Sequence, residues 1–150
     1  MIIYLAGPLF TVAERRFNAE ISAALQERVK GAEVILPQQK AAEISHEPEF
    51  LRIMCDYCLG AIEGCDCVVA ILDGADADSG TCVECGYAYA RGKPIVGVRT
   101  DSRASEDRGL NLMVAGICQF LVLNLEVNAD ARGIAAEITR VLQSIVPARD

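Results

Sequence analysis

Short apolar segments that alternate with helix-length segments constrain the fold of this chain more than any other feature. The apolar runs of strand length lie at residues 1–6, 33–36, 66–73, 94–98 and 119–123. The segments with helical patterns lie at 12–30, 49–63, from the loop that ends at Gly80 to about Arg91, from about Leu110, and at 130–146. The polar stretch 37–48 and the charged stretch 99–108 are expected to be loops. This alternation predicts a parallel sheet with helices on both faces.

The length and composition indicate one compact α/β domain over residues 1–150, a flavodoxin-like three-layer sandwich with a five-stranded parallel sheet. Its net charge of −7 argues against nucleic acid or an anionic membrane as the main partner. No apolar run has the length of a transmembrane span, and no basic region precedes the apolar N-terminus. The expected location is therefore cytoplasmic.

Seven cysteines are an odd number, and without a secretory signal they do not suggest a disulfide framework. Cys55-x-x-Cys58 and Cys82-x-x-Cys85 superficially match a four-ligand zinc site. Both pairs fall inside helical patterns rather than on the turns that zinc ribbons use. Free thiols that pack as small apolar groups are the better prediction, and no metal is expected.

The stretch 78–94 holds the strongest candidate for a functional side chain, Glu84. A buried strand ends near Asp73, an Asp- and Gly-rich loop follows, and Ser79 or Thr81 is expected to cap the next helix. Ligands of open α/β sheets bind at the carboxyl ends of the strands, so Glu84 faces such a site. The carboxylate is a candidate nucleophile or general base. The alternative is an acid that only stabilises a helix N-terminus.

Other catalytic patterns are missing from the sequence. Gly7-Pro8 follows the first strand but lacks both the dinucleotide-binding glycines and the P-loop lysine. The single histidine, His46, lies in a polar stretch and supports no Ser-His-Asp or Cys-His arrangement. Carboxylates, hydroxyls and amides must carry the chemistry, which favours attack of a carboxylate on an anomeric carbon.

Four segments together resemble the nucleoside 2-deoxyribosyltransferase family. They are Ile3-Tyr-Leu-Ala-Gly-Pro-Leu-Phe10, Cys65-Asp-Cys-Val-Val-Ala-Ile-Leu-Asp73, Asp78-Ser-Gly-Thr-x-x-Glu-x-Gly-Tyr-Ala88 and Asn111-Leu-Met113. They occur in the family's order and approximate spacing, and the resemblance extends over nearly the whole chain. The stretch around Glu84 is the specific part, because many α/β proteins begin like the first segment.

The resemblance implies a transferase that moves 2-deoxyribose between nucleobases in nucleotide salvage, without a cofactor. Glu84 would attack C1′, Tyr4 would orient it, and Asp78 would bind the sugar. Double displacement would retain the β configuration. Asn111 would reach the site of a neighbouring subunit, so a homo-oligomer is implied. Without the family resemblance, Tyr4 would be interpreted as an ordinary aromatic residue of a strand, Asp78 as a turn-forming residue and Asn111 as the cap of a helix.

Further substrate contacts are expected from the same segments and from the loop after the second strand. The motif segments supply Gly7, Phe10, Asp73, Ser79, Gly80 and Met113. Gln38 and Gln39 are candidates for contacts to the base edge, or simply polar loop residues. Asp101 and Arg103 either border the pocket or form a solvated pair of little energetic weight.

One position departs from the family, where many members carry an aspartate near the base. Counting eight residues back from Asp66 reaches Cys58, and Asp56 would point elsewhere on a helix, about 200° away. Protonation of the leaving base and base selectivity are therefore open. Two other functions remain: a hydrolase of (deoxy)nucleoside 5′-monophosphates from the same superfamily, and a non-catalytic nucleotide-binding domain.

Overall fold

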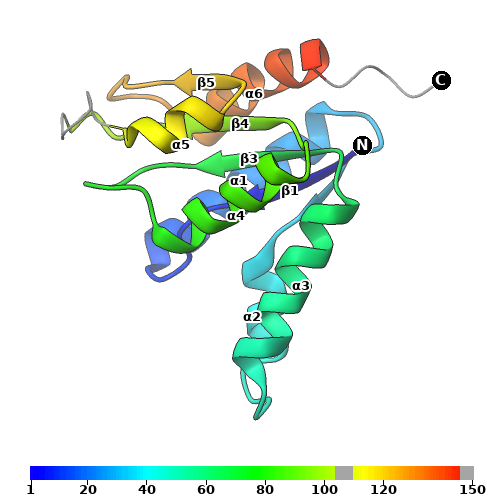
Figure 1. Cartoon of the computed structure of the whole chain (residues 1–150). Coiled ribbons are helices and arrows are strands. Elements are labelled where there is room, and N and C mark those ends of the chain that lie inside the picture. The colour runs from blue at the N-terminus through cyan, green and yellow to red at the C-terminus, as the bar shows by residue number, and fades with distance from the viewer. Residues whose placement is uncertain (104–109, 146–150) are drawn as a thin grey trace.

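Five parallel strands form one sheet in the order β2-β1-β3-β4-β5, which is the doubly wound order of flavodoxin-like proteins. The structure is a computed structural model that describes residues 1–103 and 110–145 (Figure 1). The strands are β1 (Ile2–Ala6), β2 (Glu33–Ile35), β3 (Cys67–Ile71), β4 (Ile95–Arg99) and β5 (Phe120–Leu123). The predicted five-stranded α/β fold is confirmed. The predicted loop 99–108 falls partly outside the described residues.

The described residues contain six helices, five of which pack on the faces of this sheet. α1 (Val12–Arg28) and α6 (Ala131–Ile145) cover one face, while α3 (Phe50–Gly64), α4 (Ser79–Ala90) and α5 (Leu112–Ile117) cover the other. The short α2 (Pro37–Glu43) lies beside α3, and the two extend away from the sheet (Figure 1). Among the described residues, no helix has the length and apolar character needed to cross a membrane.

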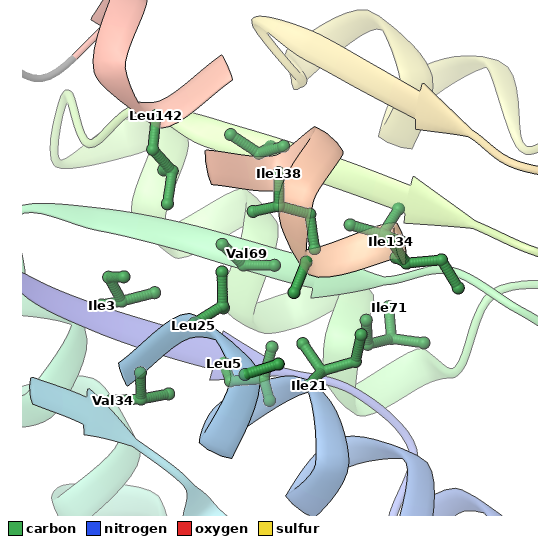
Figure 2. Close-up of a cluster of buried hydrophobic side chains, with 14 of the residues drawn as sticks. Ile3, Leu5, Ile21, Leu25, Val34, Val69, Ile71, Ile134, Ile138 and Leu142 are labelled. Atoms are coloured by element: carbon green, nitrogen blue, oxygen red, sulfur yellow. The ribbon is translucent and has the colours of Figure 1, made fainter. Parts of the chain in front are cut away.

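Side chains of β1 alternate between the two faces, as the period of a strand requires. Ile3 and Leu5 join the aliphatic cluster under α1 and α6, which also contains Val69 and Ile138 (Figure 2). Tyr4 and Ala6 join the second cluster, under α3, α4 and α5. Because Tyr4 is buried on that second face, its hydroxyl points toward the layer that contains Glu84.

The polar stretch after β2 was expected to be a loop, and this expectation is wrong for its first part. Pro37–Glu43 forms α2. Proline stands at the first helical position, where its fixed φ suits a helix and its missing N–H costs nothing. The following Gln, Lys, Ala and Glu residues are good helix formers. The polarity of this stretch suggests a loop, but the helix propensities of its residues favour a short exposed helix.

The cap of α4 also differs from the expectation of Ser79 or Thr81. Asp78 is the N-cap: its carboxylate accepts hydrogen bonds from the Thr81 backbone N at 2.8 Å and from the Thr81 hydroxyl at 3.1 Å. Asp is as good a capping residue as Ser. A polar cap at the start of this helix was therefore predicted correctly, but it lies one residue before Ser79. Ser79 is the first residue of the helix itself.

Candidate active site

A short hydrogen bond joins the two leading candidates from the sequence. The Tyr4 hydroxyl, on β1, donates to Glu84 Oε1, on α4, at 2.6 Å. Tyr4 is 0% exposed and Glu84 is half-buried, so the bond lies between the sheet and the inner side of α4. These residues are 80 positions apart in the chain. The fold therefore places a carboxylate with a fixed orientation against the face of the sheet that α3, α4 and α5 cover.

Burial dominates the electrostatics of Glu84. It raises the pKa of the carboxyl group above the ordinary value, and the negative charge of Asp78 acts in the same direction. The hydrogen bond from Tyr4 and the nearby thiol of Cys58 lower the pKa and partly offset the burial. Burial, followed by the charge of Glu84, raises the pKa of Tyr4, so its hydroxyl stays a donor. A carboxylate of raised basicity held by a neutral donor suits a nucleophile.

Cys58, on α3, is the third member of this group. It packs against the cluster that contains Tyr4, close enough to affect the pKa values of both Tyr4 and Glu84. Burial raises the pKa of Cys58, so the thiol remains protonated. The sequence singled out this position only because it departs from the family. Its proximity to Tyr4 and Glu84 depends on how α3 packs against α4, which no local pattern predicts.

The residues that begin α4 lie close to this group. Asp78 is half-buried and acts on Glu84 through its charge, while its carboxylate caps the helix. Ser79 and Gly80 are exposed in the first turn. A Cβ atom on Gly80 would lie 3.1 Å from Asp78 Oδ2. Glycine at this position thus leaves room for the capping carboxylate.

The loop after β1 contributes Gly7 and Phe10. A Cβ atom on Gly7 would lie 3.1 Å from Ile71 Cβ, so the close approach of the ends of β1 and β3 requires glycine there. The Phe10 ring is 72% exposed. A large exposed aromatic ring beside the carboxyl ends of strands is available to stack on a planar ligand.

Asp73 has a structural role that the sequence did not indicate. Its carboxylate accepts hydrogen bonds from Thr100 N and Thr100 Oγ1, each at 2.5 Å, and from Asp101 N at 3.0 Å. Buried Arg99 donates to the carbonyl oxygens of Leu72 at 2.8 Å and Gly74 at 3.2 Å. The loops after β3 and β4 are thereby tied together. An arginine that ends a buried apolar strand was the available sequence signal for this tie.

Asp101 and Arg103 form an ion pair with each other, and Asp101 also accepts a hydrogen bond from Gly74 N at 3.1 Å. Hydrogen bonds from Arg103 hold the pKa of Asp101 far below its usual range. With Phe17 and buried Ile71, both residues line a cavity of about 270 Å³. Ile71 belongs to the aliphatic cluster under α1 and α6. This cavity therefore opens on the opposite face of the sheet from Glu84.

Asn111 caps α5, which is the role that its sequence position alone predicts. Its Oδ1 accepts hydrogen bonds from Met113 N at 3.0 Å and Val114 N at 3.2 Å. Asn111 and Met113 are both exposed. They stand among other exposed apolar side chains on α5 and the edge strand β5, namely Leu112, Phe120, Leu121 and Leu123.

The two glutamines at the start of α2 have different surroundings. Gln38 donates to the Arg15 carbonyl oxygen at 2.8 Å and accepts from Asn18 Nδ2 at 3.3 Å, so it fastens α2 to α1. Gln39 is exposed and lines a shallow recess with Lys40 and Tyr57. Within the described residues, no hydrogen bond connects Gln39 to the Tyr4–Glu84 pair.

Both CxxC pairs lie on helices, Cys55 and Cys58 on α3 and Cys82 and Cys85 on α4, as the pattern indicated. All seven cysteines are free. Within residues 1–103 and 110–145, no three His, Cys, Asp or Glu side chains are grouped in a way that could hold a metal ion.

Comparisons with known proteins give the family and the fold of this chain. Residues 3–113 match the family model described as nucleoside 2-deoxyribosyltransferase. No curated protein sequence matches the chain.

Solved structures with the same fold include a conserved protein from Enterococcus faecalis, 28% identical with a TM-score of 0.73, covering 95% of this chain and 99% of that one. A 2-deoxyribosyltransferase from Bacillus psychrosaccharolyticus is 22% identical, with a TM-score of 0.71 and 90% of both chains covered. The CMP N-glycosidase BcmB from Clostridium botulinum is 19% identical, with a TM-score of 0.59, covering 93% of this chain and 99% of that one. The chain belongs to the nucleoside 2-deoxyribosyltransferase family.

Proposed function

We propose that this protein transfers 2-deoxyribose from one nucleobase to another through a covalent ester on Glu84. The observation that carries the proposal is the 2.6 Å hydrogen bond from Tyr4 to a half-buried glutamate on the face of the sheet under α3, α4 and α5. Membership of the family supports it, because the matched residues 3–113 include both side chains.

The reaction follows two displacements at C1′ of a 2′-deoxynucleoside. In the first, a Glu84 oxygen bonds to C1′, the C1′–N bond breaks, and its electron pair leaves with the base, which takes up a proton. In the second, a nitrogen of the acceptor base bonds to C1′, the ester C–O bond breaks, and the acceptor loses its proton. Glu84 is regenerated as a carboxylate. Two inversions retain the β configuration.

The other site residues keep, in this proposal, the roles that the family resemblance implies. Tyr4 holds the carboxylate in one orientation, and Asp78 binds a sugar hydroxyl beside it. Exposed Phe10 stacks on the base. Ser79, Gly80 and Asp73 border the sugar, and Gly7 lets the chain pass close to it. Gln39 contacts the edge of the base. No step needs a metal or an organic cofactor.

The proposal includes a homo-oligomer in which Asn111 and Met113 of one copy complete the site of a neighbour. Their exposure, within an apolar surface on α5 and β5, supports contact with another chain. Mixing two inactive variants tests this arrangement. Glu84→Gln and Asn111→Ala proteins, each inactive alone, should regain activity when their subunits are exchanged. If no activity returns in mixtures that native mass spectrometry shows to contain hybrids, the shared site is wrong.

The second candidate, an N-glycosidase that acts on nucleoside 5′-monophosphates, has one solved relative of this fold in its favour. The loop from Asp73 to Asp78 disfavours it, because the loop carries three aspartates and no Lys or Arg to bind a phosphate. Arg99 is occupied by backbone carbonyls and Arg103 by Asp101. A neutral nucleoside fits these surroundings better.

Chromatography of 2′-deoxyinosine with the protein, with and without adenine, tests the proposed function. Base exchange predicts deoxyadenosine and hypoxanthine only when adenine is present. Free deoxyribose regardless of adenine would indicate a hydrolase, and deoxynucleoside monophosphates would then be the substrates to compare. Glu84→Gln is the matched control. Binding without turnover across several purine and pyrimidine donors would favour a non-catalytic nucleotide-binding domain.

A further inference from the structure

A buried hydroxyl group lies on the inner side of α4. The buried residues of this helix are Thr81, Cys85 and Ala88, whose helical spacing defines the side that packs against the sheet. Thr81 is 1% exposed, so its hydroxyl is shielded from water and needs a partner within the protein. That partner is Asp78, whose Oδ2 accepts a hydrogen bond from the Thr81 hydroxyl at 3.1 Å.

This contact is additional to an ordinary helix cap. An N-cap aspartate needs only a backbone donor, and the Thr81 amide supplies it to the same Oδ2 at 2.8 Å. In α1 the residue at the equivalent position, Glu14, instead reaches back to the amide of its cap, Thr11. The two donors of Thr81 satisfy Oδ2. Within the described residues, no group donates a hydrogen bond to Asp78 Oδ1.

We infer that Thr81 is a positioning residue for Asp78: its amide and its buried hydroxyl hold one carboxylate oxygen, so that the other oxygen is presented to the sugar of the substrate. The inference rests on the proposed function, in which Asp78 binds a sugar hydroxyl. Thr81 does not itself touch the substrate and acts only through Asp78.

A single donor would leave the carboxylate free to turn. The torsion about the Cβ–Cγ bond of aspartate is soft, so an amide donor can be satisfied by either oxygen. Two donors that converge on Oδ2 of Asp78 make the two oxygens different. Gly80 adds the necessary space, because a Cβ atom there would lie 3.1 Å from Oδ2. The remaining oxygen is then oriented before the substrate arrives, which lowers the cost of binding a sugar hydroxyl.

The spacing along α4 connects this pair to the proposed nucleophile. Glu84 follows Thr81 by about one helical turn, and residues three apart on a helix are neighbours on its surface. Asp78 stands immediately before the first turn of the same helix. A sugar held by the free oxygen of Asp78 is therefore bound at the end of α4 that also carries Glu84.

Substitutions of Thr81 separate the hydrogen bond from packing. Thr81→Val removes the hydroxyl but keeps the amide donor and nearly the same shape, while Thr81→Ser keeps the hydroxyl. Thr81→Ala is a second variant without the donor, should the valine variant not fold. Thr139→Val is the matched control, because Thr139 is buried on α6, on the other face of the sheet, and donates to the Ala135 carbonyl oxygen at 2.7 Å.

The first measurement is the steady-state kinetics of base exchange, with KM for the donor nucleoside separated from kcat. In Thr81→Val, KM should rise about tenfold and kcat should change little, because a sugar hydroxyl bound equally in the ground and transition states contributes to KM alone. Thr81→Ser and Thr139→Val should keep a KM near that of the wild type. A loss of folded protein would lower kcat and leave KM unmoved. That result, or an equal rise of KM in Thr81→Ser, overturns the inference.

The second measurement is a double-mutant cycle with Asp78→Gly, chosen because glycine also caps helices well. If Thr81 acts through Asp78, Thr81→Val should raise KM no further once the carboxylate is absent. A further tenfold rise overturns the inference. If the wild type turns over no nucleoside, the proposed function fails. Urea denaturation of the wild type, the two single variants and the double variant then decides whether the two side chains are coupled, and additive losses of stability overturn the inference.

Discussion

The two faces of the sheet are built from different chemistry. Under α1 and α6 the buried cluster is aliphatic apart from the thiol of Cys67 (Figure 2). Under α3, α4 and α5 the cluster contains a tyrosine and several thiols, and Glu84 stands at its margin. Both clusters share the same strands, because successive residues of β1 and β3 point to opposite faces. One sheet thus supplies an aliphatic face that stabilises the fold and a second face that holds Glu84, the proposed nucleophile.

The largest effect should come from Glu84→Gln on the second face. If that face carries the chemistry, the variant should lose roughly 10³-fold or more in kcat, because glutamine cannot form the glycosyl ester. The variant should still bind a deoxynucleoside, which calorimetry would detect. Turnover at more than a few percent of the wild-type rate would mean that another group is the nucleophile.

A substitution on the aliphatic face should have the opposite profile. Ile138 on α6 is fully buried, so Ile138→Ala should lower the free energy of unfolding by about 2–5 kcal/mol. Well below its melting temperature, the variant should keep the kcat of the wild type. Urea denaturation measures the first quantity and base exchange the second, with the exposed Gln143→Ala on the same helix as control. A large fall in kcat of the folded variant would show that the two faces are coupled.

Tyr4→Phe tests a residue that is both buried in the cluster of the second face and hydrogen-bonded to Glu84. It keeps the buried ring and removes the donor to Glu84, so kcat/KM should fall about 10- to 100-fold, the range expected for a hydrogen bond to a charged group. The pKa of Glu84 should rise, and the acidic limb of the pH profile should move upward. The profile is measured beside that of the wild type. A lower rate at every pH with an unmoved limb would assign Tyr4 to substrate packing instead.

The smallest effect is a pH-dependent gain in the thermal stability of Glu84→Gln over the wild type. Burial raises the pKa of Glu84, so the folded protein binds this proton more tightly than the unfolded chain. The stabilisation that this tighter proton binding contributes to the folded state is complete below the ordinary glutamate pKa. It is lost as the pH rises through the raised pKa of folded Glu84. At neutral pH, Glu84→Gln should therefore melt at a higher temperature than the wild type. The difference should narrow in acid, and a difference independent of pH would contradict this explanation.

The sequence predicted the fold well because the alternation of strands and helices is a strong periodic signal. It singled out Glu84 as a candidate because a strand-loop-helix transition is local, and the functional role of Glu84 stays a prediction. It missed α2, whose residues favour a helix but show no apolar face. The pairing of Tyr4 with Glu84 came from the family resemblance, since the direction of a strand residue is local but its partner is not. The proximity of Cys58 to that pair arises only from helix packing and had no sequence signal of its own.

The tie between the loops after β3 and β4 has a consequence for backbone dynamics. The amides of Thr100, Asp101 and Gly74 donate to aspartate side chains rather than to other backbone groups. In hydrogen exchange, these loop amides should be protected like those of a strand. Because the pKa of Asp101 lies far below its usual range, the protection of Gly74 should persist in acid. The loops at the carboxyl ends of β3 and β4 then behave as a rigid rim, although their backbone belongs to no regular element.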